Sequence, residues 1–262
     1  MKALRIAATG MQAQELNVEV ISNNIANMRT TGFKQVRAEF QDLLYQDIRR
    51  VGANSSASGN IIPTGVQVGY GVKTGATARI MTQGNLQQTG KELDVAIRGE
   101  GFFSVQTPDG QTAYTRDGSF ELDANGNLVT LDGFQVQPNI TVPNNARSIT
   151  INREGEVQAL LDTSTTPTNL GQIQLSRFVN KAGLQSIGDN LYLETPASGT
   201  AIDGTADTAG FGSISQNFLE NSNVNAVSEL SDLISAQRAY EMNAKVISAS
   251  DEMMQASASI VR

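Results

Sequence analysis

The sequence predicts an α+β fold, in which long N- and C-terminal helices form a coiled-coil-like assembly domain and extended arms connect them to an all-β central domain. Three observations lead to this prediction. Apolar residues recur at heptad spacing at both ends of the chain, turn-forming pairs punctuate its middle, and only 5% of its 262 residues are aromatic. So small an aromatic content suits elongated pieces that complete their cores with neighbouring subunits.

The N-terminal segment has the spacing of a helix that packs against other helices. Between Leu4 and Met28 every position of one heptad seam is apolar except Gln14, and a second apolar stripe lies on a neighbouring face. An ordinary amphipathic helix that docks on one globular core needs a single apolar face. We therefore expect several helical neighbours. The residues expected on this assembly surface are Leu4, Ala7, Met11, Val18, Ile21, Asn23, Asn24, Ile25, Asn27 and Met28.

Three asparagines near the end of this segment allow two interpretations. Asn23, Asn24 and Asn27 are poor helix formers, so they and Gly32 could simply end the helix, with Asn27 in a left-handed turn. Alternatively, buried Asn amides hydrogen-bond across subunits and set the register of assembly, as polar residues do in coiled-coil seams.

The C-terminal segment repeats the pattern over a longer stretch. Apolar residues from Leu233 to Val261 recur every seven positions. Asn225 stands where an N-cap is expected, and Glu229 follows in the first turn, where the helix dipole favours an acid. The residues expected on its assembly surface are Leu230, Leu233, Tyr240, Ile247, Met254 and Val261.

The middle of the chain has the pattern of strands joined by tight turns. Turn pairs occur at Asp109-Gly110, Asp117-Gly118, Asn125-Gly126 and Asp132-Gly133. The short apolar or β-branched runs between them predict an antiparallel meander. Residues 121–132 resemble a calcium loop only superficially, because the first and last ligand positions are wrong, and the glycines of residues 69–75 predict a kinked strand. Further strands are expected at residues 93–97, 147–151, 156–161, 172–178 and 191–194.

This order of elements predicts three regions. Residues 1–32 and 222–262 form the helical assembly domain, residues 33–92 and 195–221 form extended arms and connecting β segments, and residues 93–194 form an antiparallel outer domain. Both helices are expected to leave the same side of the outer domain, so that they can pair with each other and with copies from neighbours.

The composition excludes several classes of function. The chain has no Cys and no His, which removes the usual zinc ligands, thiol nucleophiles and imidazole acid–base catalysis, and no cofactor is expected. With a formal net charge of −7, the chain lacks the positive electrostatic field that nucleic-acid binding requires. No cleavable signal peptide or membrane span is expected, because charged and polar residues interrupt every apolar stretch.

Long motifs identify the family that this sequence resembles. Residues 22–34, SNNIANMRTTGFK, resemble the N-terminal signature of the bacterial flagellar rod and hook family, and residues 222–255, SNVNAVSELSDLISAQRAYEMNAKVISASDEMMQ, resemble its C-terminal signature. The middle matches in IRGEGFFSV, AYTRDGSFELDANGNLVTLDGFQVQP and LQSIGDNLYLETPASG. The resemblance covers the chain from end to end. Within the family, the chain length and the run at residues 40–97 are typical of subunits at the distal end of the rod.

The resemblance implies a structural subunit rather than an enzyme. Such a subunit is exported without a cleavable signal through the flagellar secretion channel and polymerises helically into a hollow rod, which spans the periplasm and transmits torque from motor to hook. The implied partners are other copies of the chain, proximal rod and hook subunits, outer ring proteins and the export apparatus, with no nucleic acid and no membrane insertion. In this family an arm at residues 46–65 distinguishes the straight rod from the bendable hook. The arm residues carried over are Tyr45, Gln46, Ile48, Arg49, Ile61 and Pro63.

Two alternatives remain open at this point. The first is a proximal rod or hook subunit of the same family. The second is a hydrolase of cell-wall glycan that uses two carboxyl groups about 5 to 9.5 Å apart in a cleft. Its candidate residues are Asp94, Glu100 and Asp117, but no motif brings any two of them together.

Overall fold

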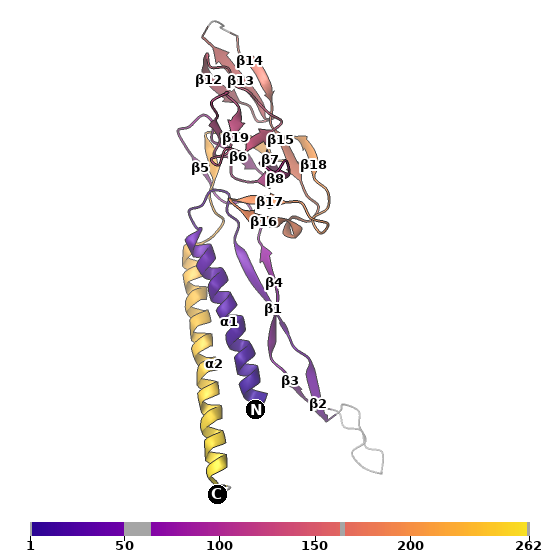
Figure 1. Ribbon diagram of the computed structural model, residues 1–262, viewed down its shortest axis with the longest axis vertical. Coiled ribbons are helices and arrows are strands. Elements are labelled where there is room, and N and C mark those ends of the chain that lie inside the picture. Colours follow the sequence, from indigo (N-terminus) through magenta and orange to yellow (C-terminus); the bar gives the residue numbers. More distant parts are fainter. Residues whose placement is uncertain (1, 50–63, 163–165, 261–262) are drawn as a thin grey trace. The chain divides into compact units, whose positions relative to one another are not determined.

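A computed structural model describes residues 2–49, 64–162 and 166–260 of the chain. The predicted α+β class is confirmed, because a long helix lies at each end and the region between them is rich in strands (Figure 1). The described residues pack into two units. The helical unit draws on Met1–Ile25, Val36–Ala78 and Ala226–Arg262, and the β unit on Ala26–Gln35 and Arg79–Asn225. Predictions for Ile61, Pro63 and Val261 lie outside the described residues, as does most of the predicted arm at residues 46–65.

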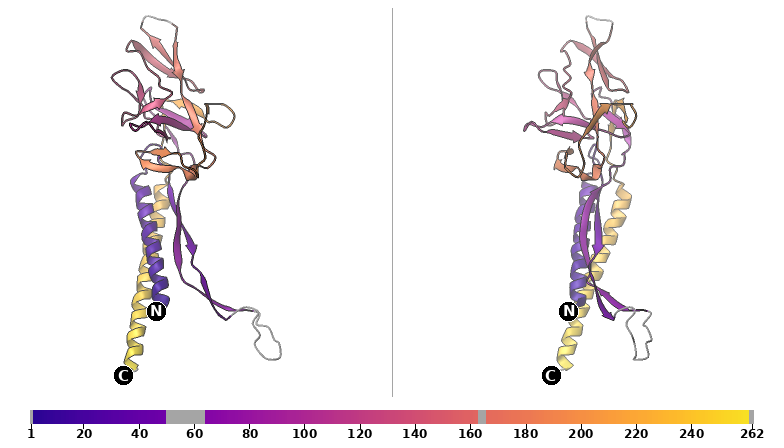
Figure 2. Two further views of the ribbon diagram at one scale, coloured as in Figure 1. Left: turned by 45° about the vertical axis from the view of Figure 1, so that its right-hand side comes forward. Right: turned by 90° about the vertical axis from the view of Figure 1, so that its right-hand side faces the viewer.

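The two terminal helices pair in an antiparallel arrangement within the helical unit. Helix α1 spans Lys2–Ala26 and helix α2 spans Ala226–Ile260. The Asn24 amide nitrogen lies 3.2 Å from a carboxylate oxygen of Glu229, and Gly10 lies against the side chain of Asn243. Both views in Figure 2 show the helices side by side. Because α2 has 35 residues and α1 has 25, the last turns of α2 continue past the start of α1.

The ends of these helices follow from local sequence. Asn225 immediately precedes α2 and Glu229 lies in its first turn, as expected for a capped N-terminus. Helix α1 ends at Ala26, so Met28 lies beyond the helix. Gly10 allows close approach of α2, because a Cβ atom at this position would lie 2.9 Å from the Asn243 side chain.

A long two-stranded ribbon completes the helical unit. Strand β1 (Val36–Asp42) pairs with β4 (Val72–Arg79), and β2 (Tyr45–Arg49) pairs antiparallel with β3 (Val66–Gly69). The ribbon bends where β3 gives way to β4, and Gly71 there has a φ of 113°. The prediction of a kinked strand at residues 69–75 is therefore confirmed.

Replacing Gly71 with Val is expected to destabilise the helical unit by about 1–3 kcal/mol. A side chain at this positive φ is strained, and its Cβ would lie 2.2 Å from the Thr9 hydroxyl oxygen of α1. The same hydroxyl accepts a hydrogen bond from the Val72 amide at 3.3 Å. Urea unfolding followed by circular dichroism measures the change. Lys73→Val, which places the same side chain at an exposed strand position two residues later, should change stability far less.

The central sheet of the β unit is antiparallel, but it is not the simple meander that the turn spacing predicted. Its order is β16-β17-β8-β7-β11-β10-β9, and β15 pairs with β7 and β18. These strands span Phe102–Gln106 (β7), Thr112–Thr115 (β8), Glu121–Leu122 (β9), Leu128–Val129 (β10), Gln135–Gln137 (β11), Gln174–Arg177 (β15), Gln185–Gly188 (β16), Leu191–Leu193 (β17) and Ile202–Thr205 (β18).

Three of the four predicted turns join paired neighbours, and the fourth does not. The turns at residues 109–110, 125–126 and 132–133 connect β7 to β8, β9 to β10 and β10 to β11. Asp117 instead accepts hydrogen bonds from the Ser119 amide at 3.0 Å and the Ser119 hydroxyl at 2.7 Å. This local bonding forms a corner, after which the chain crosses to the far edge of the sheet. Turn chemistry predicted a change of direction but not the strand that would be met.

Smaller sheets flank this one. Strands β12, β13 and β14 form a three-stranded sheet, β6 pairs with β19, and β5 pairs with β20. Predicted strands at 147–151, 156–161 and 191–194 are confirmed within a residue, whereas 172–178 divides between β14 and β15. These strands span Leu86–Gln88 (β5), Val95–Arg98 (β6), Ala146–Ile151 (β12), Glu156–Leu161 (β13), Thr168–Gln172 (β14), Ser213–Gln216 (β19) and Phe218–Glu220 (β20), with a 3-10 turn at Lys181–Gly183.

Two apolar clusters form the core of the β unit. In the larger one, fully buried side chains from separate strands meet, among them Ile97, Phe103 and Leu175. The rings of Phe103 and Phe120 meet edge to face with centroids 5.1 Å apart. The β unit thus builds its core within one chain, although some large apolar side chains such as Val179 stay exposed.

Candidate assembly surfaces

Helix α2 exposes most of its large apolar side chains. The exposed fraction is 51% for Ile234, 61% for Met242 and 65% for Met253. Among the side chains of α2 that the structure describes, the buried ones are Glu229, Ala236 and Ser250. Large apolar groups that contact water on one helix, while small or polar groups face its partner, indicate a surface that is completed by something else.

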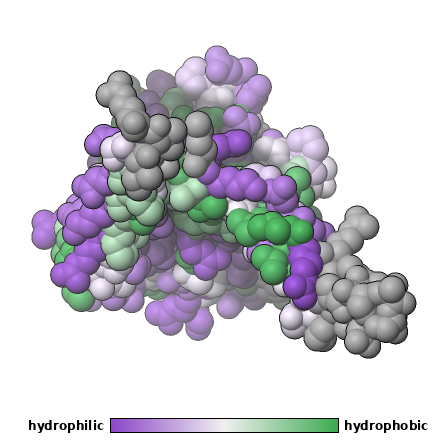
Figure 3. All heavy atoms as spheres, turned by 90° about the horizontal axis from the view of Figure 1, so that it is seen from below, coloured by the Kyte–Doolittle hydropathy of each residue, from purple (hydrophilic) through white to green (hydrophobic). Residues whose placement is uncertain are grey.

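The predicted assembly residues divide between the contact of α1 with α2 and the exposed surface. Ala7, Ile21 and Asn24 are buried within the chain. Leu4, Met11, Val18, Ile25, Asn27, Leu233 and Ile247 are half-buried, and Asn23, Met28, Leu230, Tyr240 and Met254 are exposed. The structure therefore brings both predicted faces into one helix pair and leaves most of their apolar residues at least partly accessible. In Figure 3, hydrophobic residues in green lie among hydrophilic ones in purple on the outer surface.

Asn24 joins three segments of the helical unit. Its amide nitrogen donates to the Val36 carbonyl at 2.8 Å and to Glu229, while its carbonyl oxygen accepts from the Val36 amide at 2.9 Å. Asn24 is 1% exposed and lies in the last turn of α1, which ends at Ala26. Its amide thus fixes the start of β1 against both helices of the same chain. Neither interpretation made from the sequence included this intramolecular role.

Asn24→Ala is expected to lower the free energy of unfolding by about 1–3 kcal/mol. The substitution leaves the Val36 peptide group and the Glu229 carboxylate without these hydrogen bonds in a buried place. Gln12→Ala, at an exposed position of the same helix, serves as the control and should change stability by less than about 0.5 kcal/mol. Equal effects of the two substitutions in urea unfolding would contradict the role given to Asn24.

The described part of the predicted arm presents apolar side chains to solvent. Tyr45, Gln46, Ile48 and Arg49 form strand β2, and all four are exposed. Gln46 accepts hydrogen bonds from the Tyr70 hydroxyl at 3.0 Å and from the ammonium of Lys2. The base of the arm is therefore tied to the start of α1.

The motif TTGFK contributes a buried ionic cluster in the β unit that sequence reasoning missed. Glu220 pairs with Lys34, and one of its oxygens lies 3.2 Å from the Arg116 guanidinium. All three side chains are at most 4% exposed. Burial lowers the pKa of Lys34 and of Arg116, and the Glu220 carboxylate opposes both shifts.

The backbone beside this ionic cluster requires a glycine at position 32. Gly32 has a φ of 69°, its amide donates to the Glu220 carbonyl at 2.8 Å, and a Cβ atom would lie 2.8 Å from the Asp117 amide nitrogen. Arg116 thus has a structural pairing role, and its partner Glu220 is 104 residues away in the sequence. In the sequence, the only indication of this buried cluster was that Lys34 follows Phe33 in the segment that resembles the family's N-terminal signature.

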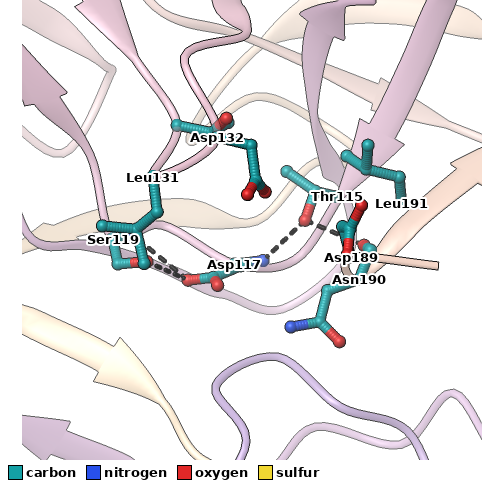
Figure 4. A pocket seen from close by; sticks show the side chains of 9 residues that line it. Thr115, Asp117, Ser119, Leu131, Asp132, Asp189, Asn190 and Leu191 are labelled. Atoms are coloured by element: carbon teal, nitrogen blue, oxygen red, sulfur yellow. Dashed lines mark hydrogen bonds between the residues drawn. The ribbon is translucent and has the colours of Figure 1, made fainter.

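The carboxylates proposed for a hydrolase do not share a cleft. Asp117 lines a cavity of about 170 Å³ that also contains Asp132 and Asp189 (Figure 4). Neither Asp94 nor Glu100 lines this cavity, and Glu100 pairs instead with Lys181. The Asp117 carboxylate accepts hydrogen bonds from Ser119, so it stabilises the corner after β8. Within the described ranges, no group of three or more acidic side chains is placed to hold a metal ion.

The hairpin at residues 121–132 also differs from a calcium loop. Strands flank it, and the Asp123 carboxylate accepts hydrogen bonds from the amides of Asn125 and Asn127 at 2.8 and 2.7 Å. These hydrogen bonds lower the pKa of Asp123, and the bond from the Asn127 amide has the largest effect. The carboxylate thus stabilises a tight turn. In the described portion of the chain, neither helix has an apolar stretch long enough to cross a bilayer.

The fold and these surfaces define a structural protein, whose distinctive feature is accessible apolar helix rather than a catalytic cleft. Family models match at three places: a flagella basal body rod protein model at residues 4–34, the D1 domain of the flagellar hook protein FlgE/F/G at 96–159, and the C-terminal region of the flagellar basal body rod FlgEFG protein at 215–260.

Relatives that match over nearly the full length of the chain indicate the same family. A flagellar basal-body rod protein FlgG of Caulobacter vibrioides is 57% identical and covers 99% of both chains. Proteins of the same name are 50% identical in Borreliella burgdorferi (97% of this chain, 96% of that one) and 39% identical in Bacillus subtilis (97% of both). The chain belongs to the flagellar basal-body rod protein family. It is a structural, non-enzymatic component of the flagellar basal body, in a family whose rod and hook subunits assemble together.

The hook alternative is not favoured. A flagellar hook protein FlgE of Helicobacter mustelae is 42% identical, but the match covers 52% of this chain and only 30% of that protein. The rod proteins of Caulobacter vibrioides, Borreliella burgdorferi and Bacillus subtilis match over nearly their whole length.

Proposed function

We propose that the chain is the subunit of the distal rod, and that it polymerises helically through its terminal helices into a hollow shaft that transmits torque from motor to hook. The observation that carries this proposal is the exposure of Ile234, Met242 and Met253 on α2. Complete burial of a fully exposed side chain of this kind contributes about 1.5–3 kcal/mol, and these three have half or more of their surface left to bury.

The exposed C-terminal end of α2 supports packing between subunits. A helix gains most of its stability from burying an apolar face. From Asp251 to Ser259 every side chain of α2 that the structure describes is exposed. We infer that the terminal helices of neighbouring copies pack around this segment in a coiled-coil-like manner, with Leu4, Leu233 and the other predicted seam residues between them.

The three predicted regions take different roles in this proposal. Residues 1–32 and 222–262 form the inner tube, residues 93–194 form the outer domain, and residues 33–92 and 195–221 connect them. The arm at residues 46–65 ties each subunit to others, with Tyr45 and Ile48 as exposed contact residues. Torque resistance follows because interdigitated side chains cannot slide without opening voids.

The remaining partners follow from this place in the flagellum. Subunits of the proximal rod and the hook join the two ends of the polymer, and outer ring proteins surround it where it spans the periplasm. Subunits reach the growing end through the flagellar export apparatus without a cleavable signal.

Electron microscopy of basal bodies from a deletion strain tests the proposal. Loss of the gene should leave a short rod without a hook, and the intact gene should restore both. Rods of normal length that carry hooks in the deletion strain would contradict the distal position. A normal rod without a hook would instead give the chain a role in hook formation.

A further inference from the structure

The helical unit carries an acidic groove between its two helices. Glu15, Val18 and Glu19 of α1 line it together with Gln237, Tyr240 and Glu241 of α2, and its volume is about 390 Å³. Val18 is half-buried and Tyr240 is 44% exposed, so the groove offers apolar surface beside three carboxylates.

The described part of the chain supplies no cation to this groove. Arg238 and Lys245 stand at helical spacing from Glu241, yet neither lines the groove, and no ion pair between described residues includes any of its three carboxylates. Glu15 and Glu19 are also a like-charge pair four residues apart, which disfavours a helix unless a cation comes close. The groove therefore fits a basic group accompanied by an apolar one.

A second groove of the same unit has the complementary character. Arg5, Ala8 and Thr9 of α1 line it with Leu43, Leu44 and Tyr70, and its volume is about 430 Å³. Leu44 is 84% exposed, and Arg5 is exposed without an ion pair to any described residue. This basic patch thus presents a guanidinium together with the highly exposed side chain of Leu44.

Both surfaces include residues of α1, and the two sets are ten residues apart. Residues 5, 8 and 9 of α1 line the basic patch, and residues 15, 18 and 19 line the acidic groove. A shift of ten residues moves about 15 Å along a helix and turns about 80° around it. One chain cannot bring both surfaces together, but two copies can.

We propose that the acidic groove of one copy receives Arg5 and Leu44 of a second copy of this chain. Leu44 packs between Val18 and Tyr240, and the Arg5 guanidinium pairs with Glu15, Glu19 or Glu241. When the groove of one copy takes the patch of a second and its own patch enters a third, the contact is heterologous, and repetition of a heterologous contact that does not close a ring produces an open helical polymer. A two-fold dimer would instead pair each groove with the other copy's patch and stop at two copies. This inference rests on the proposed helical assembly and names a contact within it.

Cysteine cross-linking tests the contact, because the natural chain has no Cys. Cells that produce the two single variants Leu44→Cys and Tyr240→Cys together should yield rods in which mild oxidation gives a covalent dimer of one variant with the other. Val179→Cys, at an 85% exposed position of the β unit, replaces Leu44→Cys in the control and should give no dimer with Tyr240→Cys. Rods that form without the Leu44–Tyr240 dimer, or a cross-link from Tyr240→Cys to another basal-body protein, would overturn the inference while leaving the proposed function intact.

Charge reversal gives a second measurement that does not depend on cysteines. Purified full-length Arg5→Glu should need about tenfold more protein to sediment as polymer, since like charges then face each other. Glu15→Lys combined with Glu19→Lys should do the same, and a mixture of the two variant proteins should sediment better than either alone. Unimpaired polymerisation of both variants would overturn the contact. If the unsubstituted protein never polymerises, the proposed function fails together with it.

Discussion

A protein carrying Ile234→Gln, Met242→Gln and Met253→Gln together is expected to fold normally and to lose polymerisation. These side chains are already 51–65% exposed in one chain, so their replacement removes little intramolecular packing. Gln is also a good helix former, which preserves α2. In the assembled rod each substitution should cost about 1 kcal/mol or more of lost apolar burial. Three of them per subunit raise the concentration needed for assembly on the order of a hundredfold.

Two measurements separate assembly from folding. Circular dichroism and urea unfolding of the monomer should match the unsubstituted protein, while sedimentation and rod length in cells should not. Val179→Gln makes the same kind of change at an exposed site of the β unit and should leave assembly nearly unchanged. Normal rods from the triple variant would show that the exposed face of α2 is not the assembly surface.

Glu220→Gln is expected to destabilise the β unit by about 3–5 kcal/mol. The substitution removes the only carboxylate that the described structure places in contact with both Lys34 and Arg116, and it leaves two buried cations facing each other. Urea unfolding should show a large fall in the free energy of unfolding. The exposed pair of Lys91 and Glu121 provides the control, because Glu121→Gln should cost at most about 1 kcal/mol.

The pH dependence of the Glu220→Gln variant adds a second test. Burial already lowers the pKa of Lys34 below its usual 10.5, and loss of the carboxylate lowers it further. Between the lowered folded-state pKa and 10.5 the unfolded chain binds more protons than the folded one, so stability rises with pH in that window. The variant should therefore recover part of its stability under alkaline conditions. A variant that is as stable as the unsubstituted protein at neutral pH would contradict the role given to the cluster.

Local patterns predicted the elements that depend on local chemistry. Heptad spacing identified both helices, and Asn225 with Glu229 marked the start of α2 to the residue. Turn pairs such as Asn125-Gly126 identified three hairpins of the sheet. Heptads at both ends also indicated helices with more apolar surface than a single partner covers, but they did not predict that Ile234, Met242 and Met253 are the residues left exposed.

Long-range packing decided what these patterns could not. The corner at Asp117 has the composition of a hairpin turn, yet the chain there crosses to β9, because strand pairing depends on which apolar faces meet. Lys34 and Glu220 are 186 residues apart, so no local signal connects them. Asn24 has the sequence signature of a helix end, but the fold buries it, and both the nitrogen and the oxygen of its side-chain amide form hydrogen bonds with Val36.

By itself, the sequence determined the fold class, the family and the presence of two long terminal helices, since periodicity, turn chemistry and signature motifs are properties of neighbouring residues. Only the tertiary structure decided which apolar side chains stay exposed, which charges share a buried site, and how acidic and basic surfaces are placed along α1. These depend on contacts between residues far apart in the chain, where burial and distance, rather than order in the sequence, set the energy of each interaction.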